Sequence, residues 1–251
     1  QQATGHPTHY DRECLKLSED EIQAKLDAGQ RRVIRFKVSS GQEVKFTDLV
    51  KGEIKFNTRD IDDQIILKSD GFPTYHLASV VDDFSMKINY VIRGEEWLSS
   101  TPKHLLLYQS LGWPPPQFAH LPLLLNSDKS KLSKRQGDVA VEDYRAQGYL
   151  PSALINFVAL LGWNPGTEQE IFSLAELIKV FDLKKVHKAG AVFNLDKLDW
   201  FNSIYIKKLS ADDFKKLAMP YLQKNISTIA PDLKLSKLFS INLTFNFYFT
   251  Q

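Results

Sequence analysis

Hydrophobic and polar residues near the start of the chain alternate first with a helical period and then with the period of strands. Ser18 and Glu21 form a capping box ahead of the helical spacing, and Gly29 ends it. A period of two then recurs in three short segments separated by glycines: residues 33–38, 43–46 and 53–56. The pattern predicts a small α+β piece over residues 1–60.

The middle of the chain alternates predicted strands with predicted helices. Apolar runs and helical spacing give, in order, a strand at residues 64–68, a helix at 75–83, and strands at 88–93 and 121–125. Thr101 is a good N-cap, with Pro102 at the first helical position, for a second helix that Gly112 ends. This order is typical of an α/β domain with a parallel sheet, which we predict over residues 61–127.

From Val141 onward the spacing of apolar residues is helical. It predicts three helices: residues 153–161, 174–180 and 195–206. Residues 236–251 differ, because Phe245, Phe247 and Phe249 recur there at the period of a strand. The predicted fold class is therefore α/β, preceded by the α+β piece and followed by an all-helical region.

Composition narrows the class of protein without naming a function. A chain of 251 residues that is 43% hydrophobic and 25% charged can bury a core, which excludes disordered and fibrous classes. Its 32 basic and 30 acidic residues nearly balance, so any contact with nucleic acid must come from local patches. The single cysteine, Cys14, excludes an internal disulfide and a multi-cysteine zinc site. No run of 18 apolar residues or signal-peptide pattern occurs, so we expect neither secretion nor membrane insertion.

A basic loop follows the last predicted strand of the α/β domain. Residues 129–135 contain four cations among small neighbours, which can close over a polyphosphate. Lys131 and Lys134 are our candidates for stabilising the transition state when a carboxylate attacks the α-phosphate of ATP. Standing alone, such a loop is usually a solvated surface or a localisation patch, so its neighbours decide its role.

Several polar residues cluster around the strand at residues 88–93. Arg93 lies at the carboxyl end of this strand, where α/β sheets place their ligand crevice, and can grip a carboxylate with two hydrogen bonds. Glu96 can accept hydrogen bonds from a ribose or an amine. Tyr75 and Ser79 share one helix face, with His76 adjacent. A surface ion pair for Arg93, a solvated Glu96 and core packing for Tyr75 are the alternatives.

Three segments of the chain resemble bacterial-type glutamyl-tRNA synthetases, a class I family, in order and spacing: residues 71–83, 91–104 and 131–135. The likeness continues to about residue 206. It implies that Lys131, Leu132, Ser133, Lys134 and Arg135 form the second class I signature, which binds ATP. Leu132 stands where the better-known form of the signature has methionine.

The resemblance also assigns roles outside the signature. It implies that Glu96 faces ATP and that Tyr75, His76, Ser79 and Arg93 line a glutamate pocket. The family commonly has asparagine where Ser79 stands, so the donor there is shorter. The implied substrates are ATP with Mg²⁺, glutamate and tRNA(Glu), and no residue of this chain is assigned as a metal ligand. We expect a monomer in the bacterial cytoplasm, or in the mitochondrial or plastid matrix of a eukaryote.

By the same resemblance the chain divides into four parts. These are the remainder of an acceptor-stem-binding insertion, the second half of a Rossmann-like nucleotide fold, the signature loop with a helical stem-contact domain, and the start of an anticodon-binding domain: residues 1–60, 61–127, 128–210 and 211–251. The first class signature, His-Ile-Gly-His, does not occur, although residues 6–9 have its outline. We therefore expect a fragment with half an active site.

The missing signature leaves other functions open. A glutaminyl-type or non-discriminating synthetase would share these motifs. A noncatalytic tRNA-binding product would keep stem contacts without the chemistry, and an incomplete gene model would not exist as such in the cell.

Overall fold

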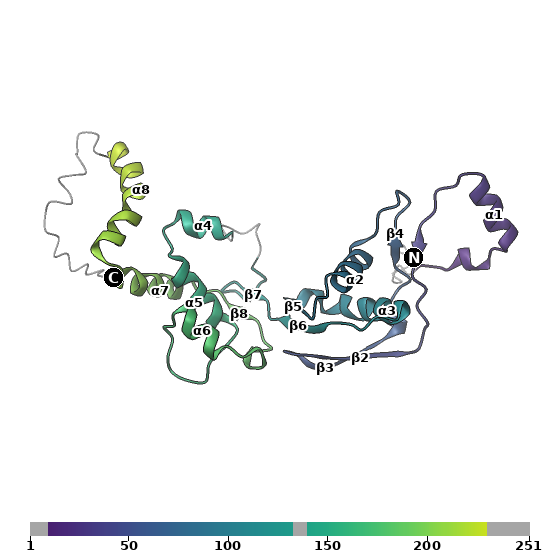
Figure 1. Ribbon diagram of the computed structural model, residues 1–251, viewed down its shortest axis with the longest axis horizontal. Helices are drawn as coiled ribbons and strands as arrows, with labels where there is room; N and C mark the ends of the chain where they lie inside the picture. Colours follow the sequence, from purple (N-terminus) through teal and green to yellow (C-terminus); the bar gives the residue numbers. More distant parts are fainter. Residues whose placement is uncertain (1–9, 133–139, 230–251) are drawn as a thin grey trace. The chain divides into compact units, whose positions relative to one another are not determined.

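The computed structural model describes residues 10–132 and 140–229 (Figure 1). The chain forms two compact units, residues 1–137 with 158–194 and residues 138–157 with 195–251. Ser133, Lys134 and Arg135 of the basic loop, the His-Pro-Thr-His sequence at residues 6–9 and the alternating segment at 236–251 lie outside the described residues.

The N-terminal elements are a short 3-10 turn, a helix and a two-residue strand: η2 Glu13–Lys16, α1 Glu19–Asp27 and β1 Ile34–Arg35. The predicted capping box is confirmed, because Ser18 Oγ accepts a hydrogen bond from the backbone amide of Glu21 and the Glu21 carboxylate accepts one from the backbone amide of Ser18. The strand expected at residues 33–38 is shorter because the Val38 amide donates to the Asp63 carboxylate, 2.8 Å away, and not to a neighbouring strand.

Strand β4, Ile65–Leu67, pairs antiparallel with β1 in a separate two-stranded sheet. The prediction that this run lies in the main parallel sheet is therefore wrong. A strand's neighbour depends on residues far away in the sequence, which the local pattern does not contain.

The main sheet has four strands in the order β3-β2-β6-β5: β2 Glu43–Asp48, β3 Gly52–Asn57, β5 Tyr90–Gly94 and β6 Gln117–Leu121. β2 and β3 form an antiparallel hairpin, whereas β6 runs parallel to both β2 and β5. The parallel pairings confirm the predicted α/β class. β2 and β3 precede residue 60 and β5 and β6 follow it, so the sheet continues across the boundary predicted between residues 60 and 61.

Two helices, α2 Tyr75–Ser85 and α3 Thr101–Leu111, lie side by side over this sheet (Figure 1). Val80, Leu107 and Tyr108 form a buried cluster between them. α3 continues directly from a 3-10 turn, η4 Glu95–Ser100, and ends at Gly112, whose φ of 70° suits glycine. The prediction that Thr101 is the N-cap is wrong, since Thr101 is already helical and its hydroxyl is used elsewhere.

The strand predicted at residues 121–125 is replaced by β6 and a two-residue strand, β7 Leu124–Leu125. Pro122 lies between them and has no N–H group for a sheet hydrogen bond. β7 pairs in parallel with β8, Ala191–Val192, so the region after residue 128 is not all-helical as predicted. Helix α6, Leu174–Val180, agrees with its prediction and packs through Leu177 in a core cluster with Val50, Ala119 and Trp163.

The second unit is helical where it is described: α4 Val141–Ala146, the first half of α5 Pro151–Leu161, α7 Leu195–Lys207 and α8 Ala211–Ile229. Phe157 and Phe201 pack edge to face, with ring centroids 5.9 Å apart. Tyr205 Oη donates to Asn156 Oδ1 at 2.8 Å. In the part of the chain that the structure describes, no helix combines the length and apolar character required to span a membrane.

Candidate functional site

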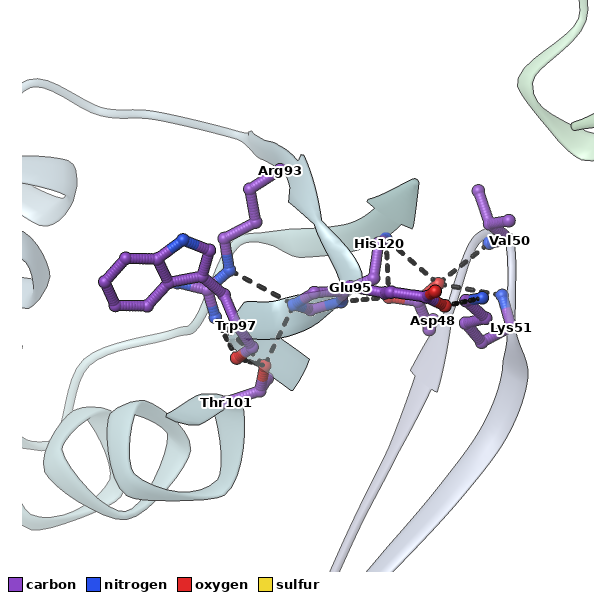
Figure 2. A network of polar contacts seen from close by, with 8 residues as sticks. All are labelled: Asp48, Val50, Lys51, Arg93, Glu95, Trp97, Thr101 and His120. Carbon is purple, nitrogen blue, oxygen red and sulfur yellow. Dashed lines mark hydrogen bonds and ion pairs between the residues drawn. The ribbon is translucent and has the colours of Figure 1, made fainter. Parts of the chain in front are cut away.

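Arg93 occupies the carboxyl end of β5, and its guanidinium is held on one edge (Figure 2). Nε donates to His120 Nε2 at 3.1 Å, and Nη2 donates to Thr101 Oγ1 at 2.9 Å. The Trp97 carbonyl also accepts from Nη2, at 3.4 Å. None of these partners is a carboxylate, which differs from the surface ion pair considered as an alternative. The positive charge is therefore fixed in place without a carboxylate partner among these contacts.

Burial lowers the pKa of Arg93, and the nearby Tyr75, Asp83 and Asp48 oppose this effect only in part. The guanidinium lies 6.0 Å from the centroid of the Trp97 ring and 5.7 Å from that of Phe118. Partial desolvation strengthens the attraction between such a cation and an incoming anion. Arg93 is thus suited to bind a carboxylate.

The three residues predicted on α2 have different surroundings. Tyr75 is 53% exposed, and its ring centroid lies 4.9 Å from that of Trp97, so it stands beside Arg93 and is not a core residue. His76 Nδ1 instead faces His104 Nε2 at 2.9 Å. Ser79 Oγ donates to the His76 carbonyl in its own helix, at 3.4 Å. The structure therefore places Tyr75 next to Arg93, whereas His76 contacts His104.

His104 is 3% exposed, and burial together with the positive charges of Arg93 and Lys103 lowers its pKa to about 3. Burial, Lys103 and Arg93 also lower the pKa of His76. Both imidazoles are consequently neutral near pH 7, and they add no positive charge next to Arg93.

We expect the NMR signals of the His104 ring to stay in the neutral position from pH 8 to pH 5. Because the folded-state pKa lies below the unfolded value of about 6.5, the unfolded chain takes up a proton first as the pH falls. Stability is thus complete above about pH 6.5 and declines below it, by up to about 1.4 kcal/mol per pH unit for one group. Replacing His104 with Gln should remove this part of the slope, and an NMR midpoint near 6.5 would contradict the burial argument.

Glu96 and Lys131 meet, although 35 residues separate them in the sequence. Lys131 Nζ lies 3.3 Å from Glu96 Oε1. The turn after β7 brings Lys131 there, because the Asn126 amide donates to the Ser130 carbonyl and Leu132 donates to Leu124. The pKa of Glu96 is lowered by its own backbone amide and then by the charge of Lys131. Of the predicted ATP-binding residues, Glu96, Lys131 and Leu132 are described.

Sequence reasoning missed a buried polar network beside Arg93 (Figure 2). His120 Nδ1 donates to Asp48 Oδ2 at 2.7 Å, and both side chains are fully buried. The Asp48 carboxylate also accepts from the backbone amides of Val50, Lys51 and His120, at 2.8–3.2 Å. Burial raises the pKa of Asp48, but these hydrogen bonds outweigh it and leave the pKa lowered.

The network continues to the residue next to Glu96. Lys51, in the β2–β3 turn that Asp48 holds, forms an ion pair with Glu95 and donates to the Lys188 carbonyl at 2.5 Å. Glu95 Oε1 also accepts from the Leu123 amide at 3.4 Å. Two features of the sequence could have indicated this network, His120 inside an apolar run and Asp48 at the end of a strand. Neither feature predicts that the two side chains are in contact.

Comparisons with known proteins agree with the motifs. Residues 1–200 match the family model for the catalytic domain of class I tRNA synthetases (E and Q). The chain is 56% identical over 226 residues to the glutamate–tRNA ligase of Prosthecochloris aestuarii, covering 89% of this chain and 45% of that protein. It is 53% identical over 222 residues to the glutamate–tRNA ligase of Clostridioides difficile, covering 88% and 45%.

Solved structures give the same result. The glutamate–tRNA synthetase from Elizabethkingia anophelis has a TM-score of 0.83 and 40% identity, covering 94% of this chain and 52% of that chain. A glutamate tRNA ligase from Elizabethkingia meningosepticum, in complex with its amino acid, has a TM-score of 0.81 and 39% identity, covering 95% and 52%. The chain spans somewhat less than half the length of the curated relatives above. Since the family model covers most of its residues, the chain belongs to the class I tRNA synthetases of the E and Q family.

Proposed function

We propose that the protein containing this chain is a glutamate–tRNA ligase. A carboxylate oxygen of glutamate would attack the α-phosphorus of ATP, breaking the bond to pyrophosphate and forming glutamyl-adenylate. The terminal ribose hydroxyl of tRNA(Glu) would then attack the acyl carbon and release AMP. The observation that carries the proposal is the presence of two charged side chains close together in the chain: Arg93, at the end of β5 and held by His120 and Thr101, and Glu96, in the 3-10 turn that follows and in contact with Lys131. The names of the relatives support it.

Arg93 and Tyr75 would receive glutamate. The fixed guanidinium would bind a substrate carboxylate, and the exposed phenol beside it would contact the same small molecule. His76 and Ser79 would line the pocket from α2. The neutral state of the His76–His104 pair supports this arrangement, because it leaves Arg93 as the cation of the pocket.

Lys131 would exchange its carboxylate partner for phosphate when ATP binds. The Lys131 and Glu96 side chains are 52% and 40% exposed, and an ion pair so exposed contributes little stability, so breaking it costs little. Glu96 would then be available to the ribose or adenine amine. Lys134 would stabilise the charge that develops on the phosphates, and the remaining signature residues Leu132, Ser133 and Arg135 would complete the ATP-binding loop.

Mg²⁺ would arrive with ATP, since this ion keeps several waters and binds largely through substrate phosphates. Among the described residues no group of three or more metal-binding side chains occurs, so none is assigned to the ion.

We also propose that the protein acts as a monomer, and that it acts where tRNA is charged, in the bacterial cytoplasm or an organellar matrix. The division into four parts predicted from the sequence belongs to the same proposal.

The test is transfer of labelled glutamate to tRNA(Glu) by the protein with all its natural flanking sequence. We expect ATP-dependent charging, and a Lys131→Ala variant about tenfold slower at saturating glutamate, because one cation on the phosphates is lost. Lys68→Ala is the matched control, because it removes another exposed ion pair, Lys68–Asp70, outside the part assigned to the acceptor stem. Absence of charging would contradict the ligase, while charging of tRNA(Gln) would indicate the glutaminyl-type or non-discriminating alternative.

A further inference from the structure

The four-stranded sheet contains a fully buried aspartate and histidine that the proposed reaction does not use. Asp48, at the end of β2, is 1% exposed, and His120, in β6, is 0% exposed. Burying a carboxylate costs several kcal/mol unless donors compensate it. Here the donors are the ring and the backbone of His120 and the amides of the β2–β3 turn. A pair held so completely can fix the position of whatever it contacts next.

The two ring nitrogens of His120 face groups of opposite kind. Nδ1 faces the Asp48 carboxylate, which only accepts, so Nδ1 carries the proton. Nε2 faces Arg93 Nε at 3.1 Å and the Thr101 hydroxyl at 3.2 Å. Because Arg93 Nε only donates, Nε2 offers its lone pair. Asp48 therefore selects the tautomer that can hold Arg93.

Arg93 is consequently gripped along one edge of its guanidinium. His120 accepts from Nε, and Thr101 accepts from Nη2 on the same edge (Figure 2). A free arginine side chain has about 2 kcal/mol of rotamer entropy to lose on binding a ligand. Holding the side chain before binding removes part of that cost.

We propose that His120, held by Asp48, is a positioning residue that sets the orientation of Arg93 and thereby the affinity for the substrate carboxylate. This inference rests on the proposed function, because it takes Arg93 as the carboxylate-binding group. In this proposal His120 neither contacts the substrate nor transfers a proton.

Two substitutions at one position separate the contacts of the two ring nitrogens of His120. In His120→Asn the amide nitrogen replaces Nδ1 and can still donate to Asp48, but nothing reaches Arg93. In His120→Gln the amide oxygen reaches the place of Nε2 and can still accept from Arg93. For the protein with its natural flanking sequence, we expect His120→Asn to raise the KM for glutamate about tenfold, or about 1.4 kcal/mol. The kcat and the KM for ATP should change less than twofold, and His120→Gln should restore most of the glutamate affinity.

A merely structural role predicts a different outcome. Equal loss of thermal stability in both variants with an unchanged KM for glutamate would overturn the proposal. If neither variant folds, Thr101→Val removes the other contact on the same edge, and it too must raise the KM for glutamate several-fold.

An Arg93→Lys background distinguishes failure of this inference from failure of the proposed function. Lysine has no Nε–H group for His120, so His120→Asn should have no further effect there. If Arg93→Lys alone leaves the KM for glutamate unchanged, the assignment of Arg93 to the carboxylate fails. If Arg93→Lys raises it but His120→Asn in the natural background does not, only the positioning role fails.

Discussion

Replacing Arg93 with alanine is expected to raise the glutamate concentration required for half-maximal charging of tRNA(Glu) about a hundredfold. The variant loses a partly desolvated guanidinium that His120 and Thr101 hold in place. Charge-assisted hydrogen bonds of this kind cost about 2–5 kcal/mol when one partner is truncated, and a hundredfold corresponds to about 2.7 kcal/mol. The ATP requirement should change less than twofold, because the contact of Lys131 with Glu96 does not involve Arg93. Steady-state kinetics with each substrate varied in turn measures both.

Two further variants sharpen this experiment. Arg93→Lys keeps the charge but not the planar pair of donors, so its glutamate requirement should lie between those of the natural protein and the alanine variant. Arg59→Ala removes an exposed arginine at the 3-10 turn after β3 and should leave the glutamate requirement unchanged. A glutamate dependence equal to that of the natural protein in Arg93→Ala would remove Arg93 from the pocket.

Elements that depend on neighbours in the sequence were predicted well. The capping box of Ser18 and Glu21 needs only residues three apart, and it begins α1 as expected. The helical spacing after Thr74 predicted α2, and Gly112 ends α3. In each case the signal and the structure it specifies lie within one or two helical turns.

Strand partners and caps failed where distant residues compete for the same group. The apolar run that became β4 gave no sign of pairing with β1 in place of the main sheet. Thr101 has the residue type and the following proline of an N-cap, yet its hydroxyl accepts from Arg93, eight residues earlier. The residue type predicted that this hydroxyl would cap the helix, but the hydroxyl instead accepts a hydrogen bond from Arg93.

The candidate site was predicted in part for the same reason. The motifs named Glu96 and Lys131 together, but only the fold shows that they are in contact. Asp48 and His120 lie 72 residues apart, and each is unremarkable in its own segment. A single sequence holds no information on that pairing, because it results from the parallel alignment of β2 and β6.

The second large effect is expected on stability, from Asp48→Ala. The substitution leaves four buried or part-buried N–H donors without their acceptor, those of Val50, Lys51 and the ring and backbone of His120. Each buried unpaired donor costs about 1–3 kcal/mol, less where water enters the vacated space, so we expect a loss of about 3–5 kcal/mol in the free energy of unfolding. Hydrogen exchange of the β6 amides measures it, because it reports opening of this sheet.

Asp182→Ala is the matched control, since Asp182 is an exposed carboxylate that accepts from one backbone amide, that of Lys184. Its loss should cost about 1 kcal/mol or less. A similar small effect at Asp48 would mean that the buried carboxylate is not what holds the β2–β3 turn and His120 together.

Acid provides an independent check on the same carboxylate. The pKa of Asp48 is lowered in the folded protein, so its stabilisation is complete above the unfolded value of about 3.9 and is lost as the pH falls through the folded value. The difference in stability between the natural protein and Asp48→Ala should therefore be constant at neutral pH and shrink only in strong acid. A difference that shrinks already at pH 6 would assign the titration to another group. A large and acid-resistant contribution would show that the Asp48 carboxylate stabilises the sheet, whereas its effect on Arg93 through the tautomer of His120 is measured by the KM for glutamate.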